Sequence, residues 1–314
     1  MMLNSTMKKT FRAALAIVCA GTLMAGTAAC GSTSSSGGDK VALLVSTLNN
    51  PFFVDLRDGA QAAAKDLGVD LMVSDAQNDS STQQNQAQNA QSQGAKAVII
   101  NPVDSDAASP AVAPLLSSSL PVISVDRSVT GEDVTSHIAS DNVAGGAQAA
   151  ELAKAVGEKG KVIILQGTPG AASTRDRGDG FKKEIKKYSG IEVVAEQTAN
   201  FDRAEALDVT TNLMQSNPDV VGIYAENDEM ALGAIQSLGS KAGADVKIFG
   251  FDGTEDGLKA VSNGTMVGTI AQQPKELGKK AVEAAVKAIK GESVEKTESI
   301  EVKTVTKGNV ADFQ

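Results

Sequence analysis

Polar and aromatic side chains recur directly after short apolar runs of this 314-residue chain. The run VALLVS at 41–46 is soon followed by Asn50 and, after Pro51, by two adjacent phenylalanines in a chain without tryptophan. Ligands bind beyond the carboxyl ends of strands in open α/β sheets, so such residues are site candidates. In chain order they are Ser46, Asn50, Phe52, Phe53, Asn101, Asp126, Arg127, Arg175, Arg177, Phe201, Asn227, Asp228, Phe251, Asp252 and Gln272.

The chemistry of these candidates suits a neutral, hydroxyl-rich ligand. Amide, carboxylate and guanidinium groups together both donate hydrogen bonds to hydroxyls and accept them. Aromatic rings offer apolar faces to C–H groups. A sugar has hydroxyls around its rim, C–H patches on its faces and no net charge. The pattern therefore predicts a sugar site with Phe52 and Phe53 as walls.

Single candidates also have structural interpretations. Asn50 before Pro51 fits a helix N-cap with proline in the first turn. Asn227 and Asp228 fit the cap of the helix that follows them. One of the two phenylalanines fits the core, and the charged residues fit the surface. Seven separate strand ends with the same chemistry nevertheless favour one shared site.

Other functional classes have less support in the sequence. His137 is the single histidine and lies inside a predicted strand, which favours a structural role over a Ser-His-Asp triad. The DSD at 104–106 lacks the spacing of an EF-hand, and no Cys/His cluster is present. The chain has neither a Walker A sequence nor a G-x-G-x-x-G after its first strand. We therefore expect no metal, nucleotide or other cofactor.

A sugar-cleaving enzyme is one alternative, with Asp126 and Asp252 as paired carboxylates. It needs one carboxyl that stays protonated, whereas Arg127 beside Asp126 favours the ionised form. A transcriptional repressor is another alternative, but it needs an N-terminal helix-turn-helix where this chain has a leader-like segment. The prediction is therefore a binding protein without catalysis.

The alternation of apolar runs with Ala-rich segments of helical period predicts an α/β protein. Ten strands are too many for one doubly wound domain, so two lobes are expected. The predicted N-terminal lobe comprises 40–140 and 273–301, and the C-terminal lobe comprises 141–272 and 302–314. The ten predicted strands are 41–46, 70–75, 97–102, 121–126, 134–140, 161–167, 192–197, 220–226, 246–252 and 266–272.

The N-terminus has the layout of a secretory signal peptide over residues 1–29. Basic residues precede a short apolar stretch, and small residues precede Cys30, as in a bacterial lipobox, although Thr27 stands where such motifs carry Leu or Val. We expect a lipidated Cys30 and a flexible tether over 30–39. Cleavage changes the formal net charge from −9 to about −12, which disfavours nucleic acid as a partner.

Nine motifs together resemble the D-ribose-binding proteins of bacterial ABC sugar importers. They are VALLVSTLNNPFF, INPVDSDA, VISVDR, SHIASDNVAGG, RDRGDGF, NFDR, AENDEMALGA, GFDGT and TIAQQP, and they extend over almost the whole chain after the leader. The resemblance implies a type I periplasmic-binding-protein fold, which has two Rossmann-like lobes with parallel sheets, joined by a three-segment hinge. It also implies a pentose enclosed between the lobes.

The resemblance assigns roles residue by residue, and Arg175 is not among the family's direct contacts. Phe52, Phe53 and Phe201 cover the sugar faces, while Ser46, Asn101 and Phe251 line or support the site. The residues implied to bond the hydroxyls are Asn50, Asp126, Arg127, Arg177, Asn227, Asp252 and Gln272.

The implied mechanism is hinge closure over the sugar, after which an ABC permease reads the closed form. The implied location is the outer face of the cell membrane, with the lipid on Cys30 as anchor. A binder of allose, xylose, galactose, a polyol or a signalling furanose remains an alternative with the same fold. A chemoreceptor remains open as a further partner.

Overall fold

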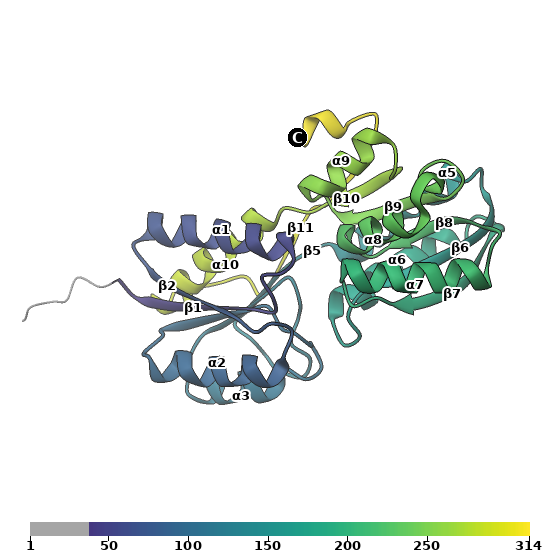
Figure 1. Cartoon of the computed structure of the whole chain (residues 1–314). Coiled ribbons are helices and arrows are strands. Elements are labelled where there is room, and N and C mark those ends of the chain that lie inside the picture. The colour runs from purple at the N-terminus through teal and green to yellow at the C-terminus, as the bar shows by residue number, and fades with distance from the viewer. Residues whose placement is uncertain (1–37) are drawn as a thin grey trace, which may run out of the picture. The chain divides into compact units, whose positions relative to one another are not determined.

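The computed structural model describes residues 38–314, so the predicted signal peptide and Cys30 lie outside the described residues. Within this range the chain forms two six-stranded sheets, each covered by helices on both faces (Figure 1). None of the helices in residues 38–314 is long and apolar enough to cross a bilayer. All ten strands predicted from the sequence are present.

The first sheet carries apolar strands that are buried on both faces. Alternate residues of its first strand point to opposite sides: Val41 and Leu43 pack with one pair of helices, and Ala42 and Leu44 with another. All of its strands pair in parallel. In spatial order they are β11 (Thr297–Ile300), β5 (Ser136–Ser140), β4 (Val122–Val125), β3 (Ala97–Ile100), β1 (Lys40–Val45) and β2 (Asp70–Asp75).

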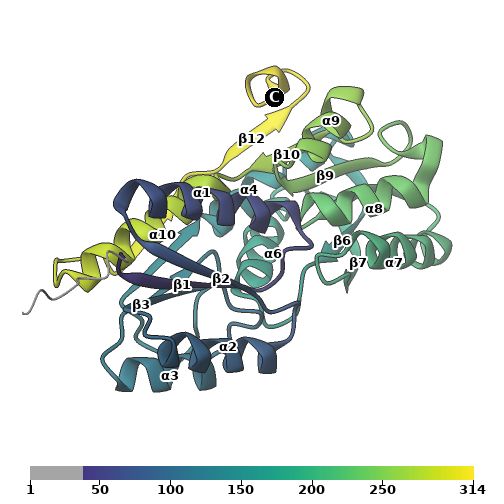
Figure 2. The same ribbon diagram turned by 60° about the vertical axis from the view of Figure 1, so that its left-hand side comes forward.

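Two helix pairs cover this sheet, one on each face, as Figure 2 shows. On one face lie α1 (Pro51–Leu67) and α10 (Pro274–Ile289), which contact each other closely although they are far apart in the chain. On the other face lie α2 (Ser80–Ser92) and α3 (Ser109–Ser117).

The second sheet repeats this arrangement with one exception. Its strands in spatial order are β12 (Lys303–Thr306), β10 (Gly268–Ala271), β9 (Lys247–Asp252), β8 (Val220–Ala225), β6 (Lys159–Gln166) and β7 (Gly190–Thr198). The edge strand β12 pairs antiparallel with β10. It follows β11 after two residues and keeps its direction, so it enters the second sheet against the other strands.

Helices also cover both faces of the second sheet. One face packs against α7 (Arg203–Ser216), α8 (Asp228–Leu238) and α9 (Glu255–Asn263). The other packs against α4 (Asn142–Ala149), α5 (Leu152–Ala155) and α6 (Ala172–Ile185). Short 3₁₀ turns follow at Gly239–Lys241 and Val310–Asp312.

Between residues 38 and 314 the chain passes from one sheet to the other three times. The passages lie between β5 and α4, between β10 and α10, and between β11 and β12. Parallel strands within a sheet direct their carboxyl ends to one edge, so the residues that follow them gather there.

The α1–α10 contact depends on two glycines. A Cβ on Gly59 would lie 2.1 Å from the carbonyl oxygen of Lys275, and one on Gly278 would lie 2.0 Å from that of Leu56. Real side chains do not approach a backbone oxygen this closely, so any larger residue would force the helices apart.

We therefore expect Gly278→Ala to lower the free energy of unfolding by about 1 to 3 kcal/mol, because it overpacks a helix contact that cannot yield. Gly308→Ala is the matched control, since a Cβ there meets only Thr306 Oγ1, at 3.8 Å. Urea unfolding measures both, and the control should change stability by less than about 0.5 kcal/mol. Equal stability of the two variants would contradict the close contact.

Candidate functional site

The strand ends of the two sheets face one cavity. Nine of the ten residues predicted to bind the ligand line it, and Ser173 is the tenth lining residue. The remaining predicted residue, Gln272, lies beside the cavity and donates from Nε2 to Asp252 Oδ1 at 2.6 Å. The nine are Asn50, Phe52, Phe53, Asp126, Arg127, Arg177, Phe201, Asn227 and Asp252.

The first wall of the cavity is the beginning of α1. Asn50 is the N-cap, and its Oδ1 accepts from the backbone N–H of Phe52 at 2.9 Å. Phe52 and Phe53 lie in the first helical turn, in edge-to-face contact with centroids 5.1 Å apart. Both rings are buried in the core and also line the cavity. The same three residues therefore form the helix cap, part of the core and a wall of the cavity.

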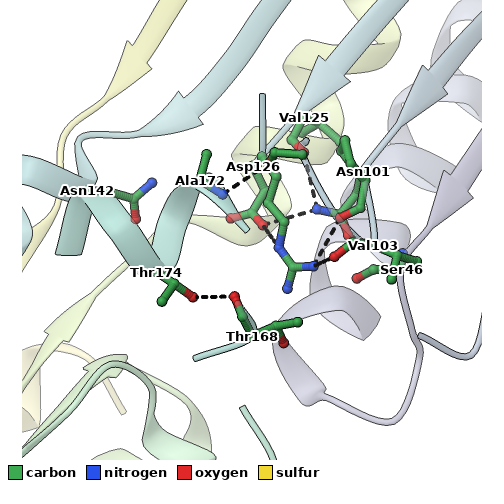
Figure 3. Close-up of polar contacts among 12 residues, drawn as sticks. Ser46, Asn101, Val103, Val125, Asp126, Asn142, Thr168, Ala172 and Thr174 are labelled. Carbon is green, nitrogen blue, oxygen red and sulfur yellow. Dashed lines mark hydrogen bonds and ion pairs between the residues drawn. The ribbon is translucent and has the colours of Figure 1, made fainter. Parts of the chain in front are cut away.

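A buried acid–base pair follows β4. Asp126 has a left-handed backbone (φ 64°), which turns the chain sharply at the strand end. Its Oδ2 accepts from Asn101 Nδ2 at 3.1 Å (Figure 3). The same oxygen lies 3.7 Å from Arg127 Nε. Arg127 Nη1 donates to the carbonyl oxygens of Pro102 and Val103 at 3.0 and 3.1 Å. The guanidinium is therefore held from behind by backbone acceptors.

A second acid–base pair lies on the other lobe. Arg177 donates from Nε to Asn142 Oδ1 and from Nη1 to the carbonyl of Glu226, both at 2.8 Å. Its Nη1 also lies 3.6 Å from Asp252 Oδ1. Each lobe thus contributes one buried arginine and one buried aspartate, and the four formal charges cancel. A neutral ligand fits this balance better than an ion does.

Aromatic rings cover the two guanidinium groups. Arg127 lies 5.4 Å from the ring centroid of Phe53 and 5.5 Å from that of Phe201. Arg177 lies 5.8 Å from the Phe201 centroid and 3.9 Å from that of Phe251. These distances are within the range of cation–π attraction. Phe201, from the second lobe, therefore contacts the cations of both lobes.

Several buried polar atoms at the cavity have no hydrogen-bond partner among residues 38–314. They are Asp126 Oδ1, Arg127 Nε and, beside the cavity, Gln272 Oε1. A buried polar group without a partner is costly, and the great majority of such groups in proteins are satisfied. The three atoms supply two acceptors and one donor, which is the capacity that sugar hydroxyls use.

The residues predicted to support the site lie behind the lining. Ser46 and Asn101 are fully buried, and the Ser46 backbone N–H donates to Asn101 Oδ1 at 3.1 Å. Phe251 is fully buried against the guanidinium of Arg177. None of the three lines the cavity.

Asn227, like Asn50, both caps a helix and lines the cavity. It is the N-cap of α8, where its Oδ1 accepts from the N–H of Met230 at 2.9 Å, and it lines the cavity. Its Nδ2 donates to the carbonyl of Phe201 at 3.4 Å, which links the cap to the aromatic wall. Phe201 and Asp252 both have positive φ, 60° and 120°. Three lining residues with sparsely populated backbones indicate strain concentrated at the site.

Direct contacts join the two lobes beside the cavity. The N–H of Ser105 donates to the carbonyl of Gly170 at 3.0 Å, and Ser105 Oγ accepts from the N–H of Ala172 at 3.1 Å. Arg175, which the resemblance left outside the ligand contacts, forms an exposed ion pair with Asp106 at 3.2 Å. These contacts hold the lobes together without the lining residues.

His137 lies on β5, away from the cavity lining. Its Nδ1 is 2.8 Å from Ser124 Oγ, and burial lowers its pKa. It lines a separate pocket near the first passage between the sheets.

Sequence reasoning missed several residues that position the site. Ser173 carried no strand-end signal, because its approach to the cavity depends on how α6 packs. Asn142 follows the predicted strand 134–140 by two residues but was not among the candidates, and it accepts from Arg177 Nε. Asp228 is one of the strand-end candidates, but no ligand contact was assigned to it. It is fully buried and accepts from the N–H of Thr254 at 2.8 Å and from Thr269 Oγ1 at 2.6 Å, so it ties α8 to the start of α9 and to β10.

Burial sets the protonation of the acids around the second lobe's strand ends. It raises the pKa of Glu226 to about 8 and that of Asp228 to about 6. It also raises the pKa of Asp252, against the opposing effect of Arg177, and lowers the pKa of Arg127. Glu226 Oε2 accepts from the N–H of Gly167 at 2.8 Å, while its Oε1 has no partner within residues 38–314. At neutral pH this carboxyl is therefore mostly protonated.

Comparison with known proteins places the chain in a family. Residues 41–293 match the periplasmic binding protein domain. The chain belongs to the periplasmic binding protein family. Ribose import binding protein RbsB of Salmonella typhimurium is 47% identical over 277 residues, which cover 88% of this chain and 93% of that protein. RbsB of Bacillus subtilis is 43% identical over 277 residues, with coverage of 87% and 90%.

Solved structures of periplasmic binding proteins share the fold. A solute binding protein of an ABC transporter from Bacillus halodurans, with bound myo-inositol, has a TM-score of 0.83 at 33% identity and covers 90% of this chain and 99% of its own. One from Actinobacillus succinogenes with bound D-allose has a TM-score of 0.82 at 33% identity, with coverage of 87% and 99%. The predicted family and the predicted two-lobed α/β fold are confirmed.

The buried Glu226 predicts a pH-dependent stability for this periplasmic binding protein. Its folded pKa of about 8 exceeds the ordinary 4.5, so folding favours the protonated form. The resulting stability is fully present below about pH 4.5 and is lost as the pH rises towards 8. We expect Glu226→Gln to remove this loss, with a gain over wild type of up to about 1.4 kcal/mol per pH unit in that window.

Denaturant unfolding between pH 5 and pH 9 measures this difference. Glu292→Gln, at an exposed position, is the matched control and should keep the wild-type profile. A Glu226→Gln profile parallel to wild type would show that the carboxyl is ionised in the folded protein.

Proposed function

We propose that this chain is the extracytoplasmic solute-binding lipoprotein of an ABC importer and binds D-ribose between its lobes. The observation that carries the proposal is the cavity lining, which combines cancelling charges, unpartnered polar atoms and aromatic faces. Relatives named for ribose import support the choice of sugar. Those names also support transport rather than catalysis.

Hydroxyl recognition is assigned to the seven polar residues proposed above as sugar contacts. Asp126 and Asp252 accept from hydroxyls, while Arg127 and Arg177 donate to them, because both guanidinium groups are oriented by acceptors behind them. Asn50, Asn227 and Gln272 complete the rim. Phe52, Phe53 and Phe201 cover the C–H faces of the ring. An epimer would leave a buried partner unsatisfied, at about 1 to 3 kcal/mol for each mismatch.

Closure follows from the division of these contacts between the lobes. A sugar held by one lobe alone makes only part of its hydrogen bonds, so its binding energy favours the arrangement in which both lobes touch it. The three passages between the sheets form the hinge, and the lobes comprise 40–140 with 273–301 and 141–272 with 302–314. The closed form is the one that the permease recognises.

A second candidate is the same mechanism with another sugar or a polyol. Similar structures hold myo-inositol and D-allose, so the fold accommodates rings of different size. Isothermal titration of the full chain, unfolded and refolded to remove retained sugar, against ribose, allose, xylose, galactose and myo-inositol separates the candidates. Tight one-to-one binding of ribose supports the ribose-binding candidate. Binding of another compound, with no heat of binding for ribose, supports the second candidate.

Arg127→Ala and Asp252→Ala should each weaken ribose binding at least tenfold, because each removes a proposed hydroxyl contact and takes the counter-charge from a buried partner. Thermal unfolding should show that both variants remain folded. Arg57→Ala is the matched control, since Arg57 pairs with Asp58 at the surface, outside the cavity. Wild-type titration curves for both cavity variants would refute the assignment of these residues.

The lipid anchor rests on the sequence around Cys30. We expect Cys30→Ser to abolish incorporation of labelled palmitate and to move the protein from the membrane fraction to the soluble fraction. Cys19→Ser, inside the predicted leader, is the matched control and should leave both unchanged. Labelling that persists in the Cys30 variant would place the attachment elsewhere.

A further inference from the structure

Helix α2 contains one buried glutamine in an otherwise polar, solvated sequence. The helix reads SSTQQNQAQNAQS and carries five glutamines. Among them only Gln83 is buried, with 3% of its surface exposed, on the side that faces the sheet. A buried amide is costly unless both of its ends are satisfied, so the contacts of Gln83 indicate its role.

Both ends of the Gln83 amide bind the loop that follows β3. Its Nε2 donates to the carbonyl of Asn101 at 2.8 Å, and its Oε1 accepts from the N–H of Val103 at 3.0 Å. Both bonds are buried. Pro102, between these residues, has no N–H of its own. The side chain therefore fixes three consecutive residues in the way that a neighbouring strand would.

The loop held by Gln83 is the one that holds Arg127. The carbonyls of Pro102 and Val103 both accept from Arg127 Nη1. The side chain of Asn101, in the same loop, donates to Asp126 Oδ2 (Figure 3). Asp126 and Arg127 thus both bond to the loop at 101–103. Gln83 itself does not line the cavity.

We propose that Gln83 is a positioning residue for sugar binding. It orients the guanidinium of Arg127 through the carbonyls of Pro102 and Val103, without touching the ligand. This inference rests on the proposed sugar-binding function. It predicts that losing the amide loosens Arg127 and weakens sugar binding while the fold persists.

The matched control lies one turn further along α2. Gln86 Nε2 donates to the carbonyl of Asp75 at 2.7 Å, so Gln86 also bonds a strand end through its amide. That strand end, unlike the loop at 101–103, gives no acceptor to Arg127. Gln83→Leu removes two buried bonds and Gln86→Leu removes one partly buried bond, and only the first variant acts on the guanidinium.

Isothermal titration of the full chain with D-ribose is the first readout. We expect Gln83→Leu to weaken binding about tenfold, as expected for loss of buried hydrogen bonds that orient a charged group. Gln86→Leu should stay within about twofold. In an Arg127→Ala background, Gln83→Leu should cause no further loss, because its effect passes through that arginine.

The conservative variant Gln83→Glu gives a signature that a general packing role would not produce. A protonated carboxyl donates to Asn101 and accepts from Val103 as the amide does, whereas the ionised form cannot donate. Its ribose affinity relative to wild type at the same pH should recover on going from pH 8 to pH 5. The Gln83→Leu ratio should stay constant.

A sugar-free readout keeps the inference separate from the proposed function. The Nη protons of Arg127, held by two backbone carbonyls, should exchange slowly in NMR spectra of the wild type and of Gln86→Leu, and rapidly in Gln83→Leu. If wild type binds no sugar of the panel, the proposed function fails and the Nη exchange alone decides this inference. Unchanged exchange in Gln83→Leu, or equal losses of affinity in the two leucine variants, would overturn it.

Discussion

The burial of four opposite charges between two lobes is the constraint on which this structure depends. Arg127, Asp126, Arg177 and Asp252 are each at most 5% exposed. Removing such charges from water costs several kcal/mol per ion unless hydrogen bonds compensate. Each lobe meets this cost separately: it carries one arginine and one aspartate, and backbone carbonyls or an asparagine accept from each arginine. Either lobe therefore stays electrically balanced when the other moves away.

The carboxyl ends of the strands place these charged residues at the cavity. The sequence folds each apolar run into a buried strand, and a residue with positive φ then turns the chain towards the cavity, as at Asp126 and Asp252. Where a helix begins immediately, its N-cap becomes part of the lining, as at Asn50 and Asn227. Capping a helix and lining a polar cavity both use short polar side chains, so one residue serves in both places.

The position of the lining residues at strand ends explains how many of them the sequence could predict. Residue types after the apolar runs predicted nine of the ten lining residues, because parallel strands bring their carboxyl ends to one edge regardless of detail. Gln83 and Ser173 could not be found in this way. Their roles depend on which face of α2 or α6 is buried and on which atoms a loop presents, and neither leaves a local pattern. The antiparallel direction of β12 could not be predicted for a related reason, because the passage from β11 fixes it.

Phe201 shows how the two lobes become one site. Its ring lies 5.5 Å from Arg127 of the first lobe and 5.8 Å from Arg177 of its own. Two guanidinium groups brought towards one another repel, and each lowers the tendency of the other to stay charged. An aromatic ring between them attracts both cations without adding charge. The meeting of two cations at one cavity therefore carries only a modest electrostatic cost.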